Sequence, residues 1–263
     1  MDLQLQNTLS LVTGSSAGIG YAIAEALLRE GARVIINGRD RNTLETALQK
    51  LKSLDSGEVL AFCGDLSRAD TARQLVEQYP DVGILVNNLG IFEPVPFEDI
   101  PDADWMRFFE INILSGVRLC RLYLPAMKQR NYGRIVFISS ESGVQIPPEM
   151  IHYGMTKSAQ IAIARGLAES LAGTGITVNS VLPGPTLSRG VEEFVSNLAA
   201  RENRSMEEFE KEFFEKVRPT SLIKRFATPE EVASLVAYTV SPLASATTGA
   251  ALRVDGGVIK SAF

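Results

Sequence analysis

Histidine and cysteine are scarce in this chain, and their scarcity limits the metal chemistry that it can support. The 263-residue sequence contains one histidine, His152, and two cysteines, Cys63 and Cys120. The cysteines have no CxxC partner, whereas protein zinc sites need several His or Cys ligands close together. We therefore expect no metal site of the alcohol-dehydrogenase kind, and we expect both cysteines to be core residues.

Long apolar runs and clusters of positive charge are also missing. No segment approaches the roughly 18 consecutive apolar residues of a membrane span, and the first residues, MDLQLQNTLS, lack the basic region and apolar stretch of a signal peptide. The net charge is -5, and no stretch of Lys and Arg could follow a phosphate backbone. We expect a cytoplasmic protein with a small-molecule partner and without nucleic acid or membrane.

The sequence does contain a regular alternation of short apolar runs with longer helical patterns. The runs are almost continuous in Val, Ile and Leu, as strands covered on both faces must be. They occupy residues 9–14, 33–37, 58–63, 83–88, 133–140, 176–184 and 251–257. Because right-handed crossovers place successive strands parallel, the pattern predicts an α/β fold. We expect one doubly wound domain over residues 1–263, with a mainly parallel sheet of about seven strands and helices on both faces.

One segment, residues 191–218, departs from this alternation. Its pattern is helical, it carries eight acidic and five basic residues, and it lies between a strand that ends near Pro183 and a helix that starts near Pro229. An insertion at the carboxyl end of such a strand lies beside the ligand crevice. We interpret the segment as a substrate lid whose apolar surface comes from Phe194, Phe209, Phe213 and Phe214. An oligomer contact or a surface flap is the alternative.

A glycine-rich turn, TGSSAGIG at 13–20, follows the first predicted strand and opens the first predicted helix. Glycine lets the backbone turn tightly and approach a pyrophosphate, while a helix N-terminus offers unpaired N–H groups and a partial positive charge. A strand before the turn and a helix after it are what a dinucleotide-binding fingerprint requires. The turn therefore predicts a dinucleotide site that includes Gly14, Ser16, Gly18, Ile19 and Gly20.

The ends of the second and third predicted strands indicate which dinucleotide binds. An acidic residue commonly follows the second strand and binds the ribose 2′-hydroxyl, but this chain has Gly38 there, followed by Arg39. A guanidinium suits a 2′-phosphate because it makes charge-assisted, bidentate hydrogen bonds. NADP(H) is therefore predicted over NAD(H). After the third strand, Asp65 is placed to accept from the adenine amino group and Leu66 to lie beside the cofactor, although Asp65 could instead initiate a turn.

With these motifs and others, the sequence resembles the short-chain dehydrogenase/reductase family along almost its whole length. The family's TGxxxGxG corresponds to TGSSAGIG, its NNAG to NNLG at 87–90, and its YxxxK to YGMTK at 153–157. The segments ISSESG at 138–143, PGPTLS at 183–188 and VDGG at 254–257 match further family motifs. The resemblance implies a single Rossmann-fold domain, an enzyme that acts on CH–OH or C=O groups, and a homotetramer or homodimer.

The resemblance also implies a catalytic set. The set is Asn112, Ser140, Tyr153 and Lys157. The serine is assigned from the family's commonest spacing between serine and tyrosine, with Ser139 and Ser142 as less favoured candidates. Tyr153 and Lys157 are four positions apart and would share one helix face. A nearby ammonium favours the anion of a phenol whose free pKa is about 10. Ser140 would hydrogen-bond the substrate oxygen, and Asn112 would hold a water for a proton path.

The remaining cofactor contacts also follow from the resemblance. They are Asn88, Gly90, Tyr153, Lys157, Pro183, Gly184, Thr186 and Ser188. The hydroxyl that contacts the carboxamide in the family would fall on Ser188, with Thr186 as the alternative. Leu89 replaces the family's small alanine, so the backbone contacts beside it are expected to shift.

These features predict an NADP(H)-dependent oxidoreductase that transfers hydride between nicotinamide and a carbonyl or secondary-alcohol substrate, with Tyr153 as general acid–base. One alternative is a 3-oxoacyl-acyl-carrier-protein reductase, which the acidic insertion disfavours because the carrier is itself acidic. Another is a non-catalytic dinucleotide-binding regulator, which would not be expected to keep all four catalytic positions. An enoyl reductase would need a lysine where Gln160 stands.

Subunit contacts are expected from the helices near 105–130 and 153–172, as in the family. The second helix carries Ile163, Leu167 and Leu171 at helical spacing, which could form that contact or could face the helix's own sheet.

Overall fold

A seven-stranded sheet forms the centre of the computed structural model, which describes residues 2–188 and 205–262. The strands are β1 (Leu9–Val12), β2 (Arg33–Gly38), β3 (Val59–Cys63), β4 (Ile84–Asn87), β5 (Gly133–Ile138), β6 (Ile176–Pro183) and β7 (Ala251–Val254). All pairs are parallel, and the order is β3-β2-β1-β4-β5-β6-β7. The predicted parallel sheet is confirmed. Its strand order reverses between β1 and β4, where ligands bind in open α/β sheets.

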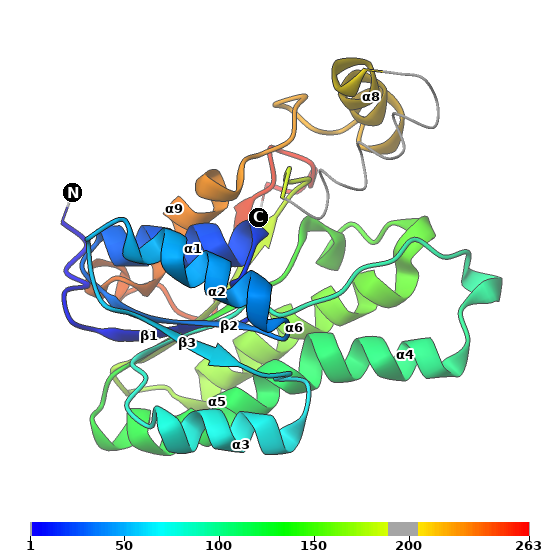
Figure 1. Cartoon of the computed structure of the whole chain (residues 1–263). Coiled ribbons are helices and arrows are strands. Elements are labelled where there is room, and N and C mark those ends of the chain that lie inside the picture. Colours follow the sequence, from blue (N-terminus) through cyan, green and yellow to red (C-terminus); the bar gives the residue numbers. More distant parts are fainter. Residues whose placement is uncertain (1, 189–204, 263) are drawn as a thin grey trace.

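Helices cover both faces of this sheet, as predicted (Figure 1). One face carries α1 (Gly18–Arg29), α2 (Arg41–Lys52) and α9 (Pro229–Val240). The other carries α3 (Ala69–Gln78), α5 (Ser115–Gln129) and α6 (Ile151–Ser170). Two shorter helices, α4 (Asp102–Phe108) and α8 (Met206–Glu212), extend beyond these layers.

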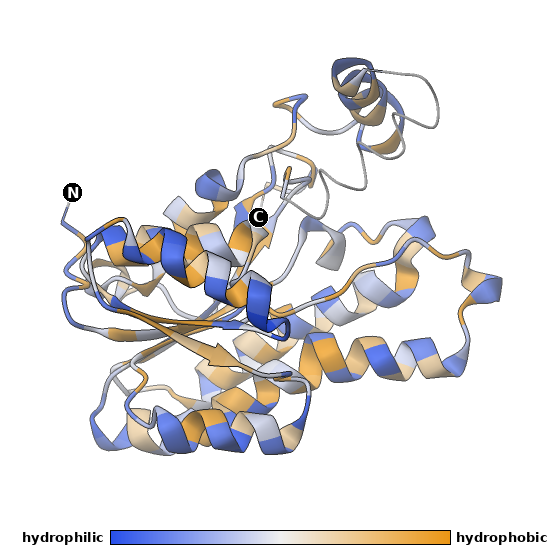
Figure 2. Cartoon of the chain, viewed as in Figure 1, coloured by the Kyte–Doolittle hydropathy of each residue, from blue (hydrophilic) through white to orange (hydrophobic). Residues whose placement is uncertain are grey.

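Strands β1 to β6 supply apolar side chains to two cores, one on each side of the sheet. Because successive side chains of a strand point to opposite faces, Leu11 packs in the core under α3, α5 and α6, whereas Val12 packs in the core under α1, α2 and α9. Ile35 and Ile36 of β2 divide in the same way. This explains why much of the sheet is orange, whereas blue is concentrated on the outer faces of the helices (Figure 2).

Several strands end earlier than their apolar runs suggest. The run at 9–14 gives a strand that stops at Val12, and Gly14 then adopts a positive φ of 61°. The run at 133–140 gives a strand that stops at Ile138, so Ser139 and Ser140 leave the sheet. The residues after each strand end are thereby free to form the edge of the site.

The helical segment after residue 101 is interrupted by a π-helical turn, Phe109–Leu114, between α4 and α5. Such turns insert one residue into the helix and occur often at functional sites. Here the turn contains Asn112, whose side chain is buried. The sequence indicated helix in this region but not the irregularity.

The two cysteines lie in different environments. Cys120 of α5 is buried, and burial raises the pKa of its thiol to about 12. Cys63 is exposed, so the prediction that it is a core residue is wrong. Its position explains the error, because Cys63 is the last residue of β3, which forms an edge of the sheet.

Residues 191–204 of the predicted insertion, Phe194 among them, lie outside the described residues. The described part contains α8 and a π-helical turn, Phe213–Val217. Phe214 is buried against Phe226, with Phe209 and Phe213 packed around them. The apolar surface predicted for this segment is therefore divided: Phe214 packs inward, while Phe209 and Phe213 face the pocket described below. The role of the segment as a lid stays a prediction.

No helix in the described ranges 2–188 and 205–262 is long and apolar enough to span a bilayer.

His152 is fully buried next to the aromatic rings of Phe108 and Trp105, and neither ring nitrogen has a hydrogen-bond partner among the described residues. Burial lowers its pKa, an effect that Arg107 reinforces and that Asp104 and Glu93 oppose. The unfolded chain takes up the proton near pH 6.5 and the folded protein resists it, so the stability present above this pH is lost as pH falls.

We predict that His152→Phe removes this acid sensitivity. Between pH 7.5 and 5.5 the wild type should lose up to about 1.4 kcal/mol more unfolding free energy than the variant, since one proton contributes at most about 1.36 kcal/mol per pH unit. Urea unfolding at both pH values measures this. Equal losses in the two proteins would show that His152 is not the titrating group.

Candidate active site

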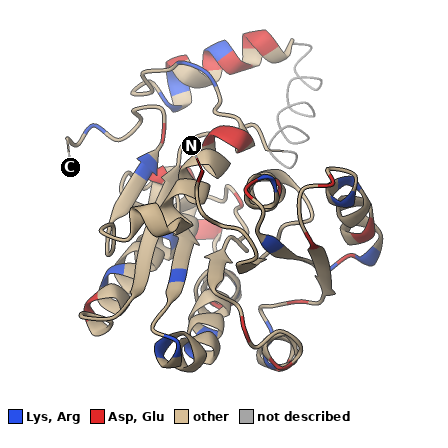
Figure 3. Cartoon of the chain, turned by 90° about the vertical axis from the view of Figure 1, so that its left-hand side faces the viewer, with Lys and Arg blue, Asp and Glu red and all other residues tan. Residues whose placement is uncertain are grey.

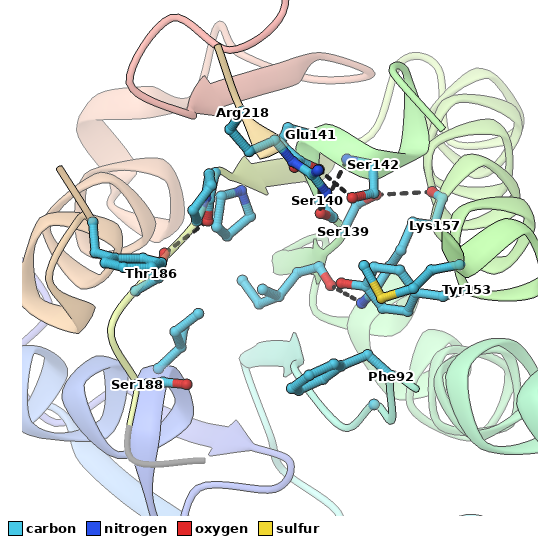
Figure 4. A pocket seen from close by; sticks show the side chains of 18 of the residues that line it. Phe92, Ser139, Ser140, Glu141, Ser142, Tyr153, Lys157, Thr186, Ser188 and Arg218 are labelled. Carbon is cyan, nitrogen blue, oxygen red and sulfur yellow. Dashed lines mark hydrogen bonds and ion pairs between the residues drawn. The ribbon is translucent and has the colours of Figure 1, made fainter. Parts of the chain in front are cut away.

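A pocket of about 460 Å³ opens at the carboxyl edge of the sheet (Figure 4). Segments that are far apart in sequence line it: the start of α1, the loops after β4, β5 and β6, the first turns of α6, and the segment around α8. The predicted residues in its lining are Ile19, Asn88, Gly90, Ser139, Ser140, Ser142, Tyr153, Lys157, Pro183, Gly184, Thr186 and Ser188. The structure thus gathers most of the predicted site in one place.

The glycine-rich turn forms one end of the site, and glycine is required at its three glycine positions for different structural reasons. Gly14 and Gly18 have positive φ angles of 61° and 59°, which side chains other than glycine rarely adopt. Gly20 is needed for close packing, because a methyl group there would lie 2.5 Å from Asn88 Nδ2 and 2.6 Å from the Gly14 carbonyl oxygen. The turn therefore has the shape of a cradle that side chains would fill.

The N-terminus of α1 suits an anion. Its N-cap residue, Ala17, makes no side-chain hydrogen bond to the helix, and the first turn contains no acidic residue. The first N–H groups of a helix have no intrahelical acceptor and carry a partial positive charge. The residues present therefore fit a dinucleotide pyrophosphate, which the turn and this helix end would hold together.

The NNLG segment is fastened to the glycine-rich turn. Thr13 Oγ1 accepts hydrogen bonds from the backbone N–H groups of Asn88 and Leu89, each at 2.9 Å. Asn88 Nδ2 donates to the carbonyl oxygens of Thr13 and Gly14. Leu89 also packs against the core between the sheet and helices α3, α5 and α6. The leucine is therefore accommodated with its backbone tied to the turn.

Lys157 is buried in α6, and its ammonium donates to the carbonyl oxygen of Ile138 at 2.8 Å and to Gln160 Oε1 at 3.3 Å. Burial lowers the pKa of Lys157 to about 7. Its Nζ atom lies 5.5 Å from the centroid of the Tyr153 ring. The two side chains therefore share a helix face, as their spacing predicted.

Tyr153 lies at the pocket with its ring edge-to-face against Phe92, at a centroid distance of 6.3 Å. Burial raises the pKa of its hydroxyl, whereas a hydrogen bond with Ser140 lowers it. In this environment the phenol is held in its protonated, proton-donating form at neutral pH.

Asn112 links the π-helical turn to α6 and to the loop after β4. Its Nδ2 atom donates to Thr156 Oγ1 and to the Ile91 carbonyl oxygen, both at 3.0 Å, and its Oδ1 atom accepts from the Ile91 N–H group at 2.8 Å. Its backbone carbonyl accepts from Gln160 Nε2 at 2.6 Å. Because Gln160 also binds Lys157, it bridges two of the predicted catalytic residues. The sequence offered Gln160 only as an argument against an enoyl reductase.

The three candidate serines differ in what their hydroxyl groups contact. Ser139 Oγ donates to the Lys157 carbonyl oxygen at 2.8 Å and so fixes α6 to the end of β5. Ser140 and Ser142 both donate to Glu141 Oε2, and Ser140 Oγ also accepts from the Ser142 N–H group. Of the three, Ser140 is the one that lowers the pKa of the neighbouring Tyr153 hydroxyl.

An ion-pair cluster beside the serines was not anticipated from the sequence. Arg218 Nε lies 3.0 Å from Glu141 Oε1, and Arg218 Nη1 lies 3.3 Å from Glu149 Oε1. Glu141 is buried, and it directly follows Ser140 within ISSESG. No local signal identifies this cluster, because Arg218 is far away in the chain and charges in 191–218 read as a solvated surface.

The predicted adenosine end lies outside the pocket, at the carboxyl ends of β2 and β3. Arg39 is exposed, and its guanidinium makes no ion pair or hydrogen bond with the described part of the chain. A methyl group on Gly38 would lie 3.1 Å from the Ser16 Cβ and Oγ atoms, so a larger residue would crowd this end. Asp40 is committed elsewhere, because its carboxylate caps α2 at Thr43.

Asp65 and Leu66 have partly structural roles. Asp65 Oδ1 accepts from both the N–H group and the hydroxyl of Ser67, which is the turn-initiating arrangement that the sequence left open. Leu66 is buried in the core between the sheet and helices α3, α5 and α6.

At the other end of the site, Gly184 packs on the VDGG segment, since a methyl group there would lie 2.6 Å from the Asp255 carbonyl oxygen. Thr186 Oγ1 donates back to the Gly184 carbonyl oxygen at 2.9 Å. Ser188 faces the glycine-rich turn, because a methyl group on Gly18 would lie 3.3 Å from its Cβ atom. Ser188 is therefore better placed than Thr186 to offer a hydroxyl to a ligand.

Comparisons with known proteins agree with this site. The family model described as short chain dehydrogenase matches residues 8–199. The uncharacterized oxidoreductase YvaG of Bacillus subtilis (strain 168) is 49% identical over 266 residues, covering 100% of both chains. D-beta-hydroxybutyrate dehydrogenase of Rhizobium meliloti (strain 1021) is 32% identical over 253 residues, covering 94% of this chain and 97% of its own.

Among solved structures, L-sorbose reductase from Gluconobacter frateurii, complexed with NADPH and L-sorbose, matches with a TM-score of 0.94 at 29% identity and covers 99% of this chain and 100% of that chain. The family match, the relatives and the parallel sheet together show that the chain belongs to the short-chain dehydrogenase/reductase family and is an oxidoreductase of alcohol or carbonyl groups that uses a nicotinamide dinucleotide.

Proposed function

We propose that this protein is an NADP(H)-dependent oxidoreductase in which Tyr153 is the general acid–base for a carbonyl or secondary-alcohol substrate. The observation that supports this best is the pocket itself, where Tyr153, Ser140 and Lys157 come together beside the glycine-rich turn. A bound NADPH would supply the hydride. The neighbouring structure of L-sorbose reductase contains that cofactor.

In the reducing direction Tyr153 donates its hydroxyl proton to the substrate oxygen. The phenol is protonated at neutral pH, as a free phenol is, and burial raises its pKa further. The Lys157 ammonium, whose Nζ atom lies 5.5 Å from the Tyr153 ring centroid, would stabilise the phenolate that remains. Ser140 would turn its hydroxyl from Glu141 to the substrate oxygen. Asn112 and Gln160 hold Lys157 in place through their hydrogen bonds.

The preference for NADP(H) is supported by Arg39 and Gly38. Arg39 is exposed and makes no ion pair with the described residues, so it can turn to a 2′-phosphate without breaking one. Gly38 contributes no carboxylate, and Asp40 is held at the start of α2. A phosphate at this point can therefore meet the Arg39 guanidinium without a carboxylate from position 38.

The acyl-carrier-protein reductase is less well supported. Helix α8, beside the pocket, carries Glu207, Glu208, Glu210 and Glu212 but only one lysine, Lys211 (Figure 3). An acidic carrier protein would be repelled by this helix. A substrate that diffuses freely fits the charge of this rim better.

We also propose that the protein forms a homodimer or homotetramer through α5 and α6. A groove of about 520 Å³ runs between these helices. Its apolar lining comes from Val117, Cys120, Leu124, Pro125, Ile163 and Leu167, and Arg121 and Lys128 also line it. Leu171, which follows Ile163 and Leu167 at helical spacing, is instead buried in the core between the sheet and helices α3, α5 and α6. Of these three residues, Leu171 therefore packs inside the subunit, whereas Ile163 and Leu167 line the groove and are available to contact a second copy of the chain.

We predict that Tyr153→Phe lowers turnover at least about a hundredfold, the scale expected for loss of a general acid–base. Dinucleotide binding should remain nearly intact because only a hydroxyl is removed, and fluorescence titration with NADPH measures this. Lys157→Ala should reduce both turnover and affinity. Activity of Tyr153→Phe above a tenth of wild type would exclude the proposed role.

We predict that Arg39→Ala weakens NADPH binding about ten- to a hundredfold and leaves NADH binding almost unchanged, because one charge-assisted hydrogen bond contributes about 1.5–3 kcal/mol. Arg73→Ala, which removes an exposed arginine of α3 that pairs with Asp70, is the control and should affect neither. Equal loss of both dinucleotides in Arg39→Ala would contradict the assignment.

We predict a dimer or tetramer in light scattering at micromolar concentration. Ile163→Glu should shift the mass toward the monomer because it places a charge in the apolar groove. A wild-type protein with monomer mass would rule out the proposed interface.

A further inference from the structure

Apart from the residues proposed for catalysis, the pocket wall is rich in aromatic and aliphatic side chains. Phe92 flanks Tyr153, and the rest of this wall comprises Met150, Phe209, Phe213, Val217 and Phe226, with the rings of Phe213 and Phe226 packed together. An apolar wall of this kind binds an apolar portion of a ligand, because the hydroxyl groups of a polyol would lose hydrogen bonds to water without replacing them.

Charge is the second property of this wall. Two side chains that carry positive charge line the described part of the pocket, Lys157 and Arg218. Lys157 is engaged with the Ile138 carbonyl and Gln160. The Arg218 side chain is 11% exposed and is shared between Glu141, which is 5% exposed, and Glu149, which is 41% exposed.

The Arg218 cluster has an excess of negative charge, since two carboxylates share one guanidinium. A carboxylate or phosphate on the substrate would approach both glutamates as well as the arginine, in a partly buried site where charges are weakly screened. An uncharged oxygen does not meet this repulsion. It can still accept from Arg218 Nη2, for which no partner is found among the described residues.

We propose that the pocket selects uncharged ketones, or the corresponding secondary alcohols, that carry an aromatic or branched apolar group, and that the Glu141–Arg218–Glu149 cluster excludes substrates with a carboxylate near the carbonyl. This inference rests on the proposed function and specifies its substrate class. Arg218 and Glu149 act as specificity residues, whereas Glu141 connects them to Ser140.

The charge part is tested with an isosteric pair, 3-oxobutanamide and 3-oxobutanoate, which differ essentially in charge. With NADPH at pH 7.5 the amide should have at least about tenfold higher kcat/KM. The apolar part is tested with 4-phenylbutan-2-one against 1,3,4-trihydroxybutan-2-one, and the aromatic ketone should be the better substrate.

Glu149→Gln is the decisive variant, because Glu149 is half-exposed and its loss leaves Arg218 paired with Glu141. The amide-to-carboxylate ratio should fall severalfold to about tenfold. Glu58→Gln is the matched control: it also removes an arginine-paired carboxylate, 49% exposed, but at the opposite edge of the sheet, beside Arg33. It should leave the ratio unchanged.

A binding measurement separates this inference from the proposed reaction. Calorimetry with 3-phenylpropanamide and 3-phenylpropanoate needs no turnover, and the amide should bind at least about tenfold more tightly. Tighter amide binding without reduction of any ketone would support the charge selection and count against the proposed function. Equal binding of the two ligands, an unresponsive ratio in Glu149→Gln, or preference for the trihydroxy ketone would overturn the inference.

Discussion

Parallel pairing of the strands is the constraint from which the site follows. Because all seven strands run the same way, their carboxyl ends meet at one edge, and every loop that leaves this edge can contribute to one pocket. Residues near 18, 90, 140, 153, 186 and 218 therefore come together although nothing in the linear sequence connects them. The pocket lies beside the reversal of strand order between β1 and β4, where the loops diverge and leave room.

Within this frame, the burial of one ammonium group organises the chemistry. An isolated buried charge is costly, so it persists only with hydrogen-bond partners. Lys157 has two, the Ile138 carbonyl and Gln160, and Gln160 also binds the carbonyl of Asn112. The π-helical turn places Asn112 within this network. Little space remains, since a methyl group on Gly90 would lie 3.5 Å from Asn112 Oδ1 and 3.6 Å from Lys157 Nζ.

The substrate side of the pocket is built differently from the cofactor side. Backbone turns, glycines and a helix end shape the cofactor side, and these depend on local sequence. Long-range contacts shape the substrate side: Arg218 reaches Glu141 across 77 positions of the chain, and Glu141 holds the hydroxyl of Ser140. Packing of the segment after α8 is thus coupled through one ion pair to a residue proposed to touch the substrate oxygen. Relatives of one fold can differ in substrate by changing such contacts.

Local patterns in the sequence were enough to predict the parallel α/β fold, the glycine-rich turn and the closeness of Tyr153 and Lys157. These features depend on local periodicity and on short spacings between residues, and the regular geometry of a strand, a turn or a helix fixes where such residues lie relative to one another. The prediction for Cys63 was wrong, because the apolar run at 58–63 does not reveal that its last residue is at a sheet edge. Tertiary structure alone decided the Glu141–Arg218–Glu149 cluster, the bridging role of Gln160 and the division of the phenylalanines between core and pocket. The reason is physical: these contacts join residues far apart in the chain, and only the packing of the whole fold sets the distance between them.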